Sequence, residues 1–333
     1  MKASLKASQP NTRASRVIDV QQLLDEQPVG RFQILVLMMC MFIVTLDGLD
    51  TVMMGFIAPA LSSAWAIPRD ALGPVMSGGL LGLAFGALCA GPLADRFGRK
   101  TVMTIAVLFF GVWSVGSAFA GNITELTVLR FLTGLGLGAS MPNAATLMAE
   151  YAPQRCRALM VTTVFCGFTL GAAGGGFVSA WLIAAHGWHS VLILGGVLPV
   201  LYVPLMIKWL PESARYLSLK ETRRARLVGV LNRIQRGMAD AATRFVSQET
   251  PQRERSPVRL ILSRDYVFGT VMLWICYFAG LLTVYLLGSW LPTLIRGAGF
   301  TLEQAAIVGA LFQAGGTIGS LAIGWLMDRV NPH

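Results

Sequence analysis

The stretch of sequence that decides the fold is GPLADRFGRK, at residues 91–100. It is short, basic and turn-forming, and apolar stretches long enough to cross a bilayer lie on either side of it, at 71–93 and 101–120. A degenerate copy, Gly324–Arg329, follows another apolar stretch. An ungapped shift of 233 residues aligns the two copies together with the apolar segments before them. The repeat indicates two related halves, as in many carriers.

Apolar stretches of about 20 residues or more recur along the whole chain. Hydrophobic residues make up 54% of the 333 residues and charged residues only 13%, against roughly 25% in soluble proteins. We predict eight membrane-spanning helices, at 32–61, 71–93, 101–120, 124–148, 158–184, 188–210, 266–294 and 301–326. The predicted fold class is an all-α polytopic membrane protein. The sequence shows no nucleophile–base pair or group of metal ligands, so we predict no enzyme, no metal site and no cofactor.

The basic residues are segregated by loop. Of the 27 Lys and Arg residues, 24 lie in the N-terminal tail, in alternate loops, in the segment 208–264 and at Arg329, whereas the opposite loops hold only Arg69 and Arg296. By the positive-inside rule the 24 face the cytoplasm, and so does the N-terminus. The net charge of +10 is therefore a signal of topology, and it requires no nucleic-acid partner.

Composition also divides the chain into segments. We expect a cytoplasmic tail at 1–31, a six-helix bundle at 32–210, a basic cytoplasmic loop at 211–264 and two helices of a second bundle at 265–333. The central loop is amphipathic in places and basic, which suits either a linker that keeps the topology or contact with anionic lipid heads.

Two carboxylates lie inside the first apolar stretch. Asp47 and Asp50 are three residues apart and therefore share one face of a helix. Charged residues in a membrane span are costly and mark functional sites by default. Two carboxylates this close resist double ionisation, so we predict that the pair carries a proton. The alternative is a watery vestibule in which both only hold neighbouring helices.

Arg130 is the one Lys or Arg residue away from the ends of the predicted spans. Counting about 1.5 Å per residue along each helix places it at a depth similar to that of Asp47 and Asp50, in the outer half. Its planar fork can pair with the aspartates when the site is empty and with a substrate carboxylate when it is occupied. A purely structural Asp–Arg pair is the rival interpretation.

The cytoplasmic turns carry charges suited to reversible contacts. Asp95, in the stretch 91–100, can meet a helix N-terminus, and its basic neighbours can clamp a facing helix end. Glu150 and Arg157, on either side of Pro153, form a second candidate latch.

At these residues the chain resembles the major facilitator superfamily, through 91–100 and its copy at 324–329. The pattern Arg130-x3-Gly134-x3-Gly138 is similar to the fourth-helix motif of that superfamily, which is associated with proton coupling. The stretch 47–51, DGLDT, looks like the signature of its aromatic acid:proton symporter family. The resemblance implies proton-coupled import of aromatic carboxylates, of the 4-hydroxybenzoate and protocatechuate type, by a monomer in the lipid bilayer of a bacterial inner membrane.

Together with the resemblance, these features predict roles for individual residues. The predicted proton-coupling residues are Asp47 and Asp50, and Arg130 is the predicted ligand of the substrate carboxylate. Aromatic residues of the seventh span are candidates to stack on the substrate ring or to act as packing and interface anchors: Trp274, Tyr277 and Tyr285. The predicted gating residues are Gly91, Asp95, Arg96, Gly98, Arg99, Glu150, Arg157, Asp328, Arg329 and His333.

The family has twelve spans, so we expect four more beyond His333 and take the chain to be C-terminally truncated. Two rival functions stay open: a carrier for another organic acid or a sugar, and a membrane sensor of aromatic acids that does not transport. The acid pair and the lone arginine favour an anionic substrate over a neutral sugar.

Overall fold

The computed structural model describes residues 17–19, 24–25, 27–218, 223–234, 244–246, 261, 263–297 and 302–330. Each of the eight apolar stretches forms a helix, as predicted, because a backbone in lipid must satisfy its hydrogen bonds internally. The bounds are α2 (Arg31–Trp65), α3 (Gly73–Phe97), α4 (Arg99–Ser117), α5 (Ile123–Tyr151), α6 (Arg157–His186), α7 (Trp188–Trp209), α11 (Val267–Gly297) and α12 (Leu302–Arg329).

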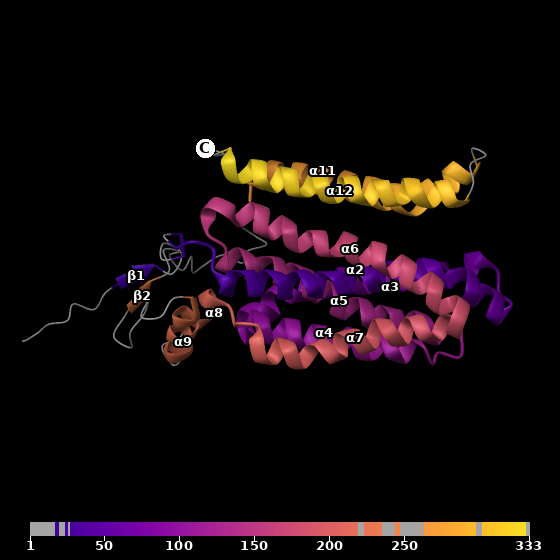
Figure 1. The fold of residues 1–333 in the computed structure, drawn as a ribbon, viewed down its shortest axis with the longest axis horizontal. Coiled ribbons are helices and arrows are strands. Elements are labelled where there is room, and N and C mark those ends of the chain that lie inside the picture. The colour runs from indigo at the N-terminus through magenta and orange to yellow at the C-terminus, as the bar shows by residue number, and fades with distance from the viewer. Residues whose placement is uncertain are drawn as a thin grey trace, which may run out of the picture.

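Helices α2 to α7 form one elongated bundle, and α11 and α12 lie together along its α6 side (Figure 1). By length and composition, five stretches among the described residues are suited to cross a membrane, within α2, α3, α4, α6 and α7. Helix α5 is not one of these five, yet it packs against both α3 and α4 inside the bundle. It carries the buried Arg130, which is consistent with its place in the interior.

The predicted turn at 91–100 is almost entirely helical. Helix α3 continues to Phe97 and α4 begins at Arg99, so the reversal of the chain is confined to Gly98. Gly98 adopts φ = +97°, a conformation that residues with a Cβ rarely adopt. The sequence prediction of a longer loop was wrong here, because a single left-handed glycine replaces it.

Glycine rows bring the helix backbones of the bundle into contact, as their spacing of four predicts. Gly82 and Gly86 of α3 face the backbone of α5, and Gly134 and Gly138 of α5 face the backbone of α3. A Cβ at any of these positions would overlap a backbone atom of the neighbouring helix. The bundle is therefore packed backbone to backbone, with little room for adjustment.

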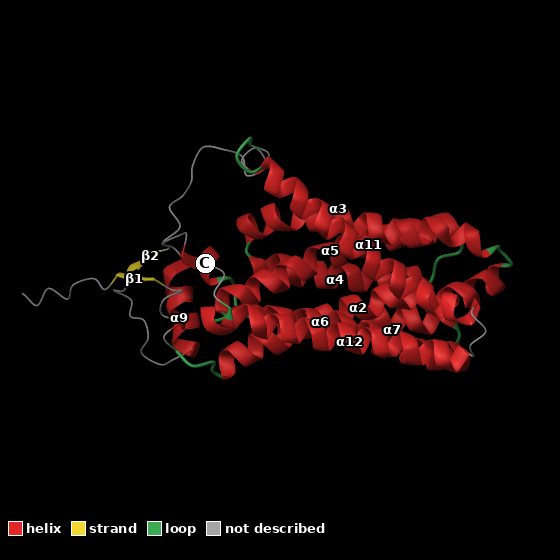
Figure 2. Ribbon diagram, turned by 90° about the horizontal axis from the view of Figure 1, so that it is seen from above, coloured by secondary structure: helices red, strands yellow, loops and turns green. Residues whose placement is uncertain are grey.

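The segments predicted to be cytoplasmic add short elements at one end of the bundle, seen in Figure 2 with the strands in yellow. They comprise α8 (Ala214–Ser218), α9 (Arg224–Ile234), the strands β1 (Val17–Asp19) and β2 (Arg244–Val246), and a 3₁₀ turn at Gln154–Cys156. A second 3₁₀ turn, Arg69–Leu72, lies between α2 and α3 at the opposite end. The strands pair in parallel, with Ile18 opposite Phe245. The all-α prediction missed this pair, whose β-branched and aromatic residues favour extended backbone.

The buried apolar residues form two main clusters at different levels of the bundle. One includes Phe32, Val36 and Tyr151, toward the predicted cytoplasmic end. The other includes Ile57 and Trp188, toward the opposite end. The buried polar residues described next lie at the level between the two clusters.

Candidate proton-coupling and gating sites

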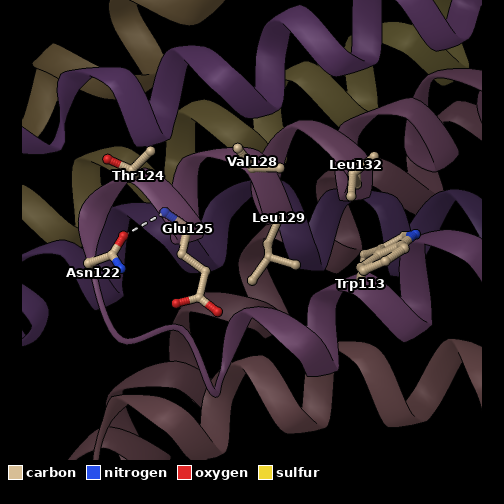
Figure 3. Close-up of a pocket in the computed structure, with 7 residues that line it drawn as sticks. All are labelled: Trp113, Asn122, Thr124, Glu125, Val128, Leu129 and Leu132. Atoms are coloured by element: carbon tan, nitrogen blue, oxygen red, sulfur yellow. Dashed lines mark hydrogen bonds between the residues drawn. The ribbon is translucent and has the colours of Figure 1, made fainter.

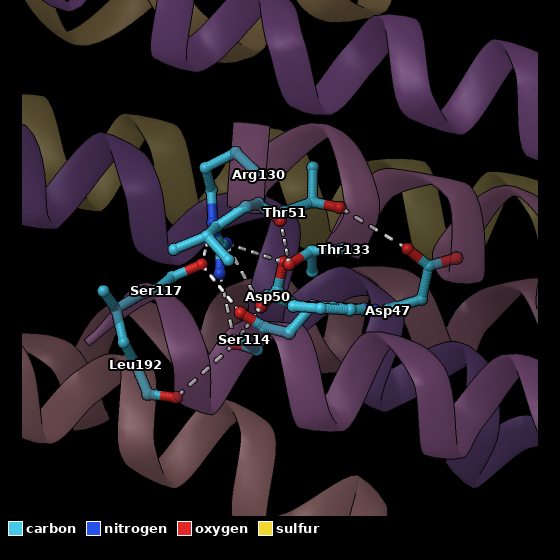
Figure 4. Close-up of polar contacts among 10 residues, drawn as sticks. Asp47, Asp50, Thr51, Ser114, Ser117, Arg130, Thr133 and Leu192 are labelled. Atoms are coloured by element: carbon cyan, nitrogen blue, oxygen red, sulfur yellow. Dashed lines mark hydrogen bonds and ion pairs between the residues drawn. The ribbon is translucent and has the colours of Figure 1, made fainter. Parts of the chain in front are cut away.

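Asp50 of α2 and Arg130 of α5 form an ion pair inside the bundle (Figure 4). Arg130 Nη1 donates to Asp50 Oδ2 at 3.2 Å and to Oδ1 at 3.4 Å. Each side chain is only 3% exposed. The proximity predicted from depth counting is confirmed for this pair. In such a poorly solvated site the loss of either charge leaves the other costly to bury.

Two serines of α4 complete the surroundings of Arg130. Arg130 Nη2 donates to Ser114 Oγ at 3.2 Å, and Nε donates to Ser117 Oγ at 3.3 Å. Ser114 Oγ in turn donates to Asp50 Oδ1 at 2.9 Å. All three nitrogens of the guanidinium are thus engaged within the bundle. Sequence reasoning missed these serines, although their spacing of three in an apolar stretch repeats that of the aspartates.

Asp47 lies one turn from Asp50 and is also buried, at 1% exposure. Its Oδ1 accepts a long hydrogen bond of 3.5 Å from the Thr51 hydroxyl. Among the described contacts, the guanidinium of Arg130 reaches Asp50 and not Asp47. The two aspartates therefore differ: one has a cationic partner and the other has only a hydroxyl.

A second site joins the bundle to the copy of the 91–100 motif. The carboxylate of Asp328, at the end of α12, accepts hydrogen bonds from the backbone N–H groups of Ala158 at 2.9 Å and Leu159 at 2.8 Å. These are free donors in the first turn of α6, where the helix dipole also favours a negative charge. Asp328, a predicted gating residue, thus forms the kind of contact that we predicted for Asp95.

The predicted cytoplasmic end of the bundle has a charged network of its own. Arg99 Nε lies 2.8 Å from Glu150 Oε1, and the Ser213 hydroxyl donates to Glu150 Oε2 at 2.6 Å. Glu212 accepts from the backbone N–H of Lys100 at 2.9 Å, in the first turn of α4. Glu150 therefore contacts Arg99 and the segment after α7.

The predicted latch between Glu150 and Arg157 is not formed in this structure. Among the described residues no ion pair involves Arg157, and its buried Nε has no hydrogen-bond partner. Glu150 satisfies its charge with Arg99, which lies closer to it at the cytoplasmic end of the bundle.

The remaining predicted residues are spread over both sets of helices. Gly91, Asp95 and Arg96 are exposed at the end of α3, and Arg329 lies over the Trp325 ring at 4.0 Å. Trp274 and Tyr277 are exposed on α11, at 58% and 69%. The side chain of Tyr285 and the whole of His333 lie outside the described part of the chain.

A separate pocket of about 710 Å³ lies against α4 and α5 (Figure 3). It is lined by Trp113, Asn122, Thr124, Glu125, Val128, Leu129 and Leu132. Asn122 acts as the N-cap of α5, its side chain accepting from the Glu125 backbone N–H at 2.8 Å. None of the predicted site residues lines this pocket, so we assign it no part in the chemistry of the ion pair.

Comparison with known proteins defines the class. Residues 40–333 match the Major Facilitator Superfamily, and the chain belongs to this superfamily of multi-pass membrane proteins. It is 53% identical to the 4-hydroxybenzoate transporter PcaK of Pseudomonas putida, over 98% of this chain and 73% of that protein. It is 50% identical to a gallate transporter of Pseudomonas putida, over 95% of this chain and 70% of that protein.

Solved structures agree on the fold. A double-tryptophan mutant of XylE matches with a TM-score of 0.70 and 18% sequence identity, over 86% of this chain and 67% of that chain. XylE is a proton:xylose symporter of the major facilitator superfamily. At this identity the likeness concerns the fold alone.

Proposed function

We propose that this chain is part of a proton-coupled importer of aromatic carboxylates, of the 4-hydroxybenzoate and gallate type, in a bacterial inner membrane with its N-terminus in the cytoplasm. The named relatives support the substrate class. The observation that carries the mechanism is the buried ion pair between Asp50 and Arg130.

The coupling follows from charge balance at that pair. With Asp50 ionised, its carboxylate compensates Arg130 and the site is neutral. When Asp50 takes up a proton, Arg130 becomes an uncompensated buried cation, which is costly. A substrate carboxylate can then supply the missing negative charge, because the planar guanidinium suits a carboxylate. One proton and one anion thus enter together, and the net charge of the site stays the same.

Asp47 has a different role in this proposal. It lies one turn nearer the cytoplasmic end of α2, with the Thr51 hydroxyl as its described hydrogen-bond donor. We assign it the next position of the proton on the way inward. The exposed aromatic side chains Trp274 and Tyr277 on α11 are the candidates to stack on the substrate ring.

Alternating access needs contacts that break when the two bundles move relative to each other. We assign this role to Asp328 at the N-terminus of α6 and, by the repeat, to Asp95 and its neighbours in the first half. The Arg99–Glu150 pair would hold the cytoplasmic end of the first bundle together during the movement.

Uptake of labelled 4-hydroxybenzoate by cells expressing the full reading frame tests the proposal. Asp50→Asn should abolish accumulation driven by a pH gradient but retain exchange of substrate across the membrane, since the loaded site, in which the substrate carboxylate compensates Arg130, can still change its orientation. Asp47→Asn should also lower accumulation. The control is Asp265→Asn, an exposed carboxylate at the start of α11 that should leave uptake unchanged.

The result that would overturn the coupling mechanism is normal concentrative uptake by both single mutants at normal expression. A panel of benzoate, gallate and xylose in the same assay tests the substrate class separately. A neutral sugar supplies no charge to compensate Arg130, so uptake of xylose in preference to every aromatic acid would favour the sugar-carrier alternative.

A further inference from the structure

Ser114 occupies a position between three helices and the ion pair. Its side chain is fully buried, at 0% exposure, on α4. Its Oγ lies 2.9 Å from Asp50 Oδ1 on α2 and 3.4 Å from the Leu192 carbonyl oxygen on α7, and it accepts from Arg130 Nη2 of α5 (Figure 4). One hydroxyl therefore faces two acceptors and one cationic donor.

The proton of Ser114 is not committed to its own helix. Other hydroxyls nearby donate to a carbonyl of their own helix: Ser117 to Trp113 at 2.8 Å, and Thr133 to Leu129 at 2.9 Å. These hydroxyls are held in one orientation by that bond. Ser114 has a single hydrogen and two acceptors on other helices, so it can satisfy only one at a time.

The protonation state of Asp50 decides between the two acceptors. A carboxylate is the stronger acceptor and is also the nearer one, so the hydroxyl donates to Asp50 while that residue is ionised. A protonated Asp50 carries a donor of its own and can donate to Ser114 Oγ. The Ser114 hydroxyl is then free to turn toward the Leu192 carbonyl and add a hydrogen bond between α4 and α7.

We propose that Ser114 is a positioning residue that stabilises the ionised form of Asp50 and transmits its protonation to the contact between α4 and α7. The proposal rests on the proposed role of Asp50 as a proton carrier. The α4–α7 contact is a close one, since a Cβ on Gly111 or Gly196 would meet the facing helix. The hydrogen bond between Ser114 and the Leu192 carbonyl therefore joins two helices, α4 and α7, whose backbones are already in contact.

The charged surroundings of Asp50 among the described residues are simple. Arg130 faces it from α5, and Asp47 lies one turn away on its own helix. Helix α4 contributes the Ser114 hydroxyl, and α7 the Leu192 carbonyl behind it. Two imidazoles lie near one end of α6 and α7; both are exposed and contact tryptophan rings: His186 and His189. Helix α6 also carries the thiol of Cys166.

The test is the pH profile of 4-hydroxybenzoate uptake by the full reading frame. Removing the hydroxyl in Ser114→Ala takes away a donor to the ionised carboxylate, so the protonated form persists to higher pH. Half-maximal uptake should therefore move to higher pH, by about one unit. Ser114→Cys, which keeps a weak donor of similar size, should give an intermediate shift.

Ser140→Ala is the matched control, because Ser140 is equally buried and donates only within its own helix, to Gly136 and Leu137. Its profile should coincide with that of the parent. Exchange of substrate down its own gradient should survive in all three variants and shows that each is folded.

A Ser114→Ala profile that coincides with that of Ser140→Ala overturns the proposal. If Ser114→Ala also loses exchange, the Ser114→Cys profile decides: a shift supports the proposal and no shift overturns it. Asp50→Asn separates the role of Asp50 from that of Ser114. Concentrative uptake by that variant removes the proposed role of Asp50 as proton carrier, whereas loss of accumulation with an unshifted Ser114→Ala removes only the role of Ser114.

Discussion

Contacts inside the six-helix bundle differ in kind from contacts between that bundle and α12. Inside, glycine rows pack backbone against backbone, and the Asp50–Arg130 pair is sealed from solvent. Between α6 and α12, the described hydrogen bonds are few: Asp328 caps the first turn of α6, and the Thr169 and Thr317 hydroxyls lie 2.7 Å apart. Close packing is described there at Gly324, where a Cβ would meet the Thr162 side chain and the Leu159 backbone.

The difference indicates which part of the molecule moves. Interpenetrating backbones cannot slide without clashing, so the bundle behaves as one body. Hydrogen bonds at a helix terminus and between two hydroxyls can be exchanged for water or for other partners at modest cost. We therefore expect the bundle to hold the proposed proton site and the seam between α6 and α12 to act as the proposed switch. Four predictions test this division, beginning with the largest expected effect.

Removing one partner of the buried pair should have the largest effect. Arg130→Gln leaves Asp50 without its cation and should lower the stability of the bundle by about 3–5 kcal/mol. The double variant Asp50→Asn/Arg130→Gln removes both charges and should recover most of this loss. Thermal unfolding in detergent measures both. If the double variant is no more stable than the single one, the pair does not act as a unit.

Adding one methyl group to the bundle interior should have the next largest effect. A Cβ in Gly138→Ala would overlap the carbonyl oxygen of Leu83 on α3, and no rotamer change can relieve an overlap with backbone. We expect the free energy of unfolding to fall by about 3 kcal/mol, the upper end of the range for overpacked cores. Gly174→Ala on α6 is the control, since a Cβ there meets nothing within 4 Å. Equal melting temperatures for the two variants would contradict the rigid-body interpretation.

Weakening the seam should change populations of conformations and leave the bundle stable. Asp328→Asn removes the charge that meets two N–H groups of α6, and its partial exposure reduces the effect to about 1.5 kcal/mol. Cross-linking between Thr169→Cys and Thr317→Cys, with the native cysteines replaced by serine, should fall about tenfold. Asp265→Asn, an exposed carboxylate outside the seam, should not alter it. A lower melting temperature of the Asp328→Asn chain with unchanged cross-linking would assign Asp328 to stability instead.

Much of the fold could be predicted from the sequence because membrane helices follow simple rules of length and composition. Apolar length predicted the positions of the eight helices. Depth counting also predicted that Asp50 and Arg130 meet. These features depend on the period and length of the helix, which the sequence displays directly.

The parts that were missed depend on rotation and on single residues. Counting depth gave Asp47 and Asp50 equal access to Arg130, but it cannot give the rotation of α2 about its axis, which turns Asp50 toward the guanidinium. A lone buried serine such as Ser114 has the sequence signature of any small packing residue. The preference of Glu150 for Arg99 over Arg157 depends on packing between segments far apart in the chain.

The smallest effect is expected at the hydroxyl pair of Thr169 and Thr317. Their coupling energy measures directly how strongly α6 and α12 are held together. The two hydroxyls lie 2.7 Å apart within the membrane region of α6 and α12. Hydrogen bonds between membrane helices average only about 0.6 kcal/mol, because the separated state also finds partners. A double-mutant cycle with Thr169→Val, Thr317→Val and both together should therefore give a coupling energy of about 0.6 kcal/mol. Thr163→Val is the control, since its hydroxyl donates to Leu159 on its own helix at 2.7 Å. A coupling well above 2 kcal/mol would mean that the seam is as fixed as the bundle, and the division between proton site and switch would then fail.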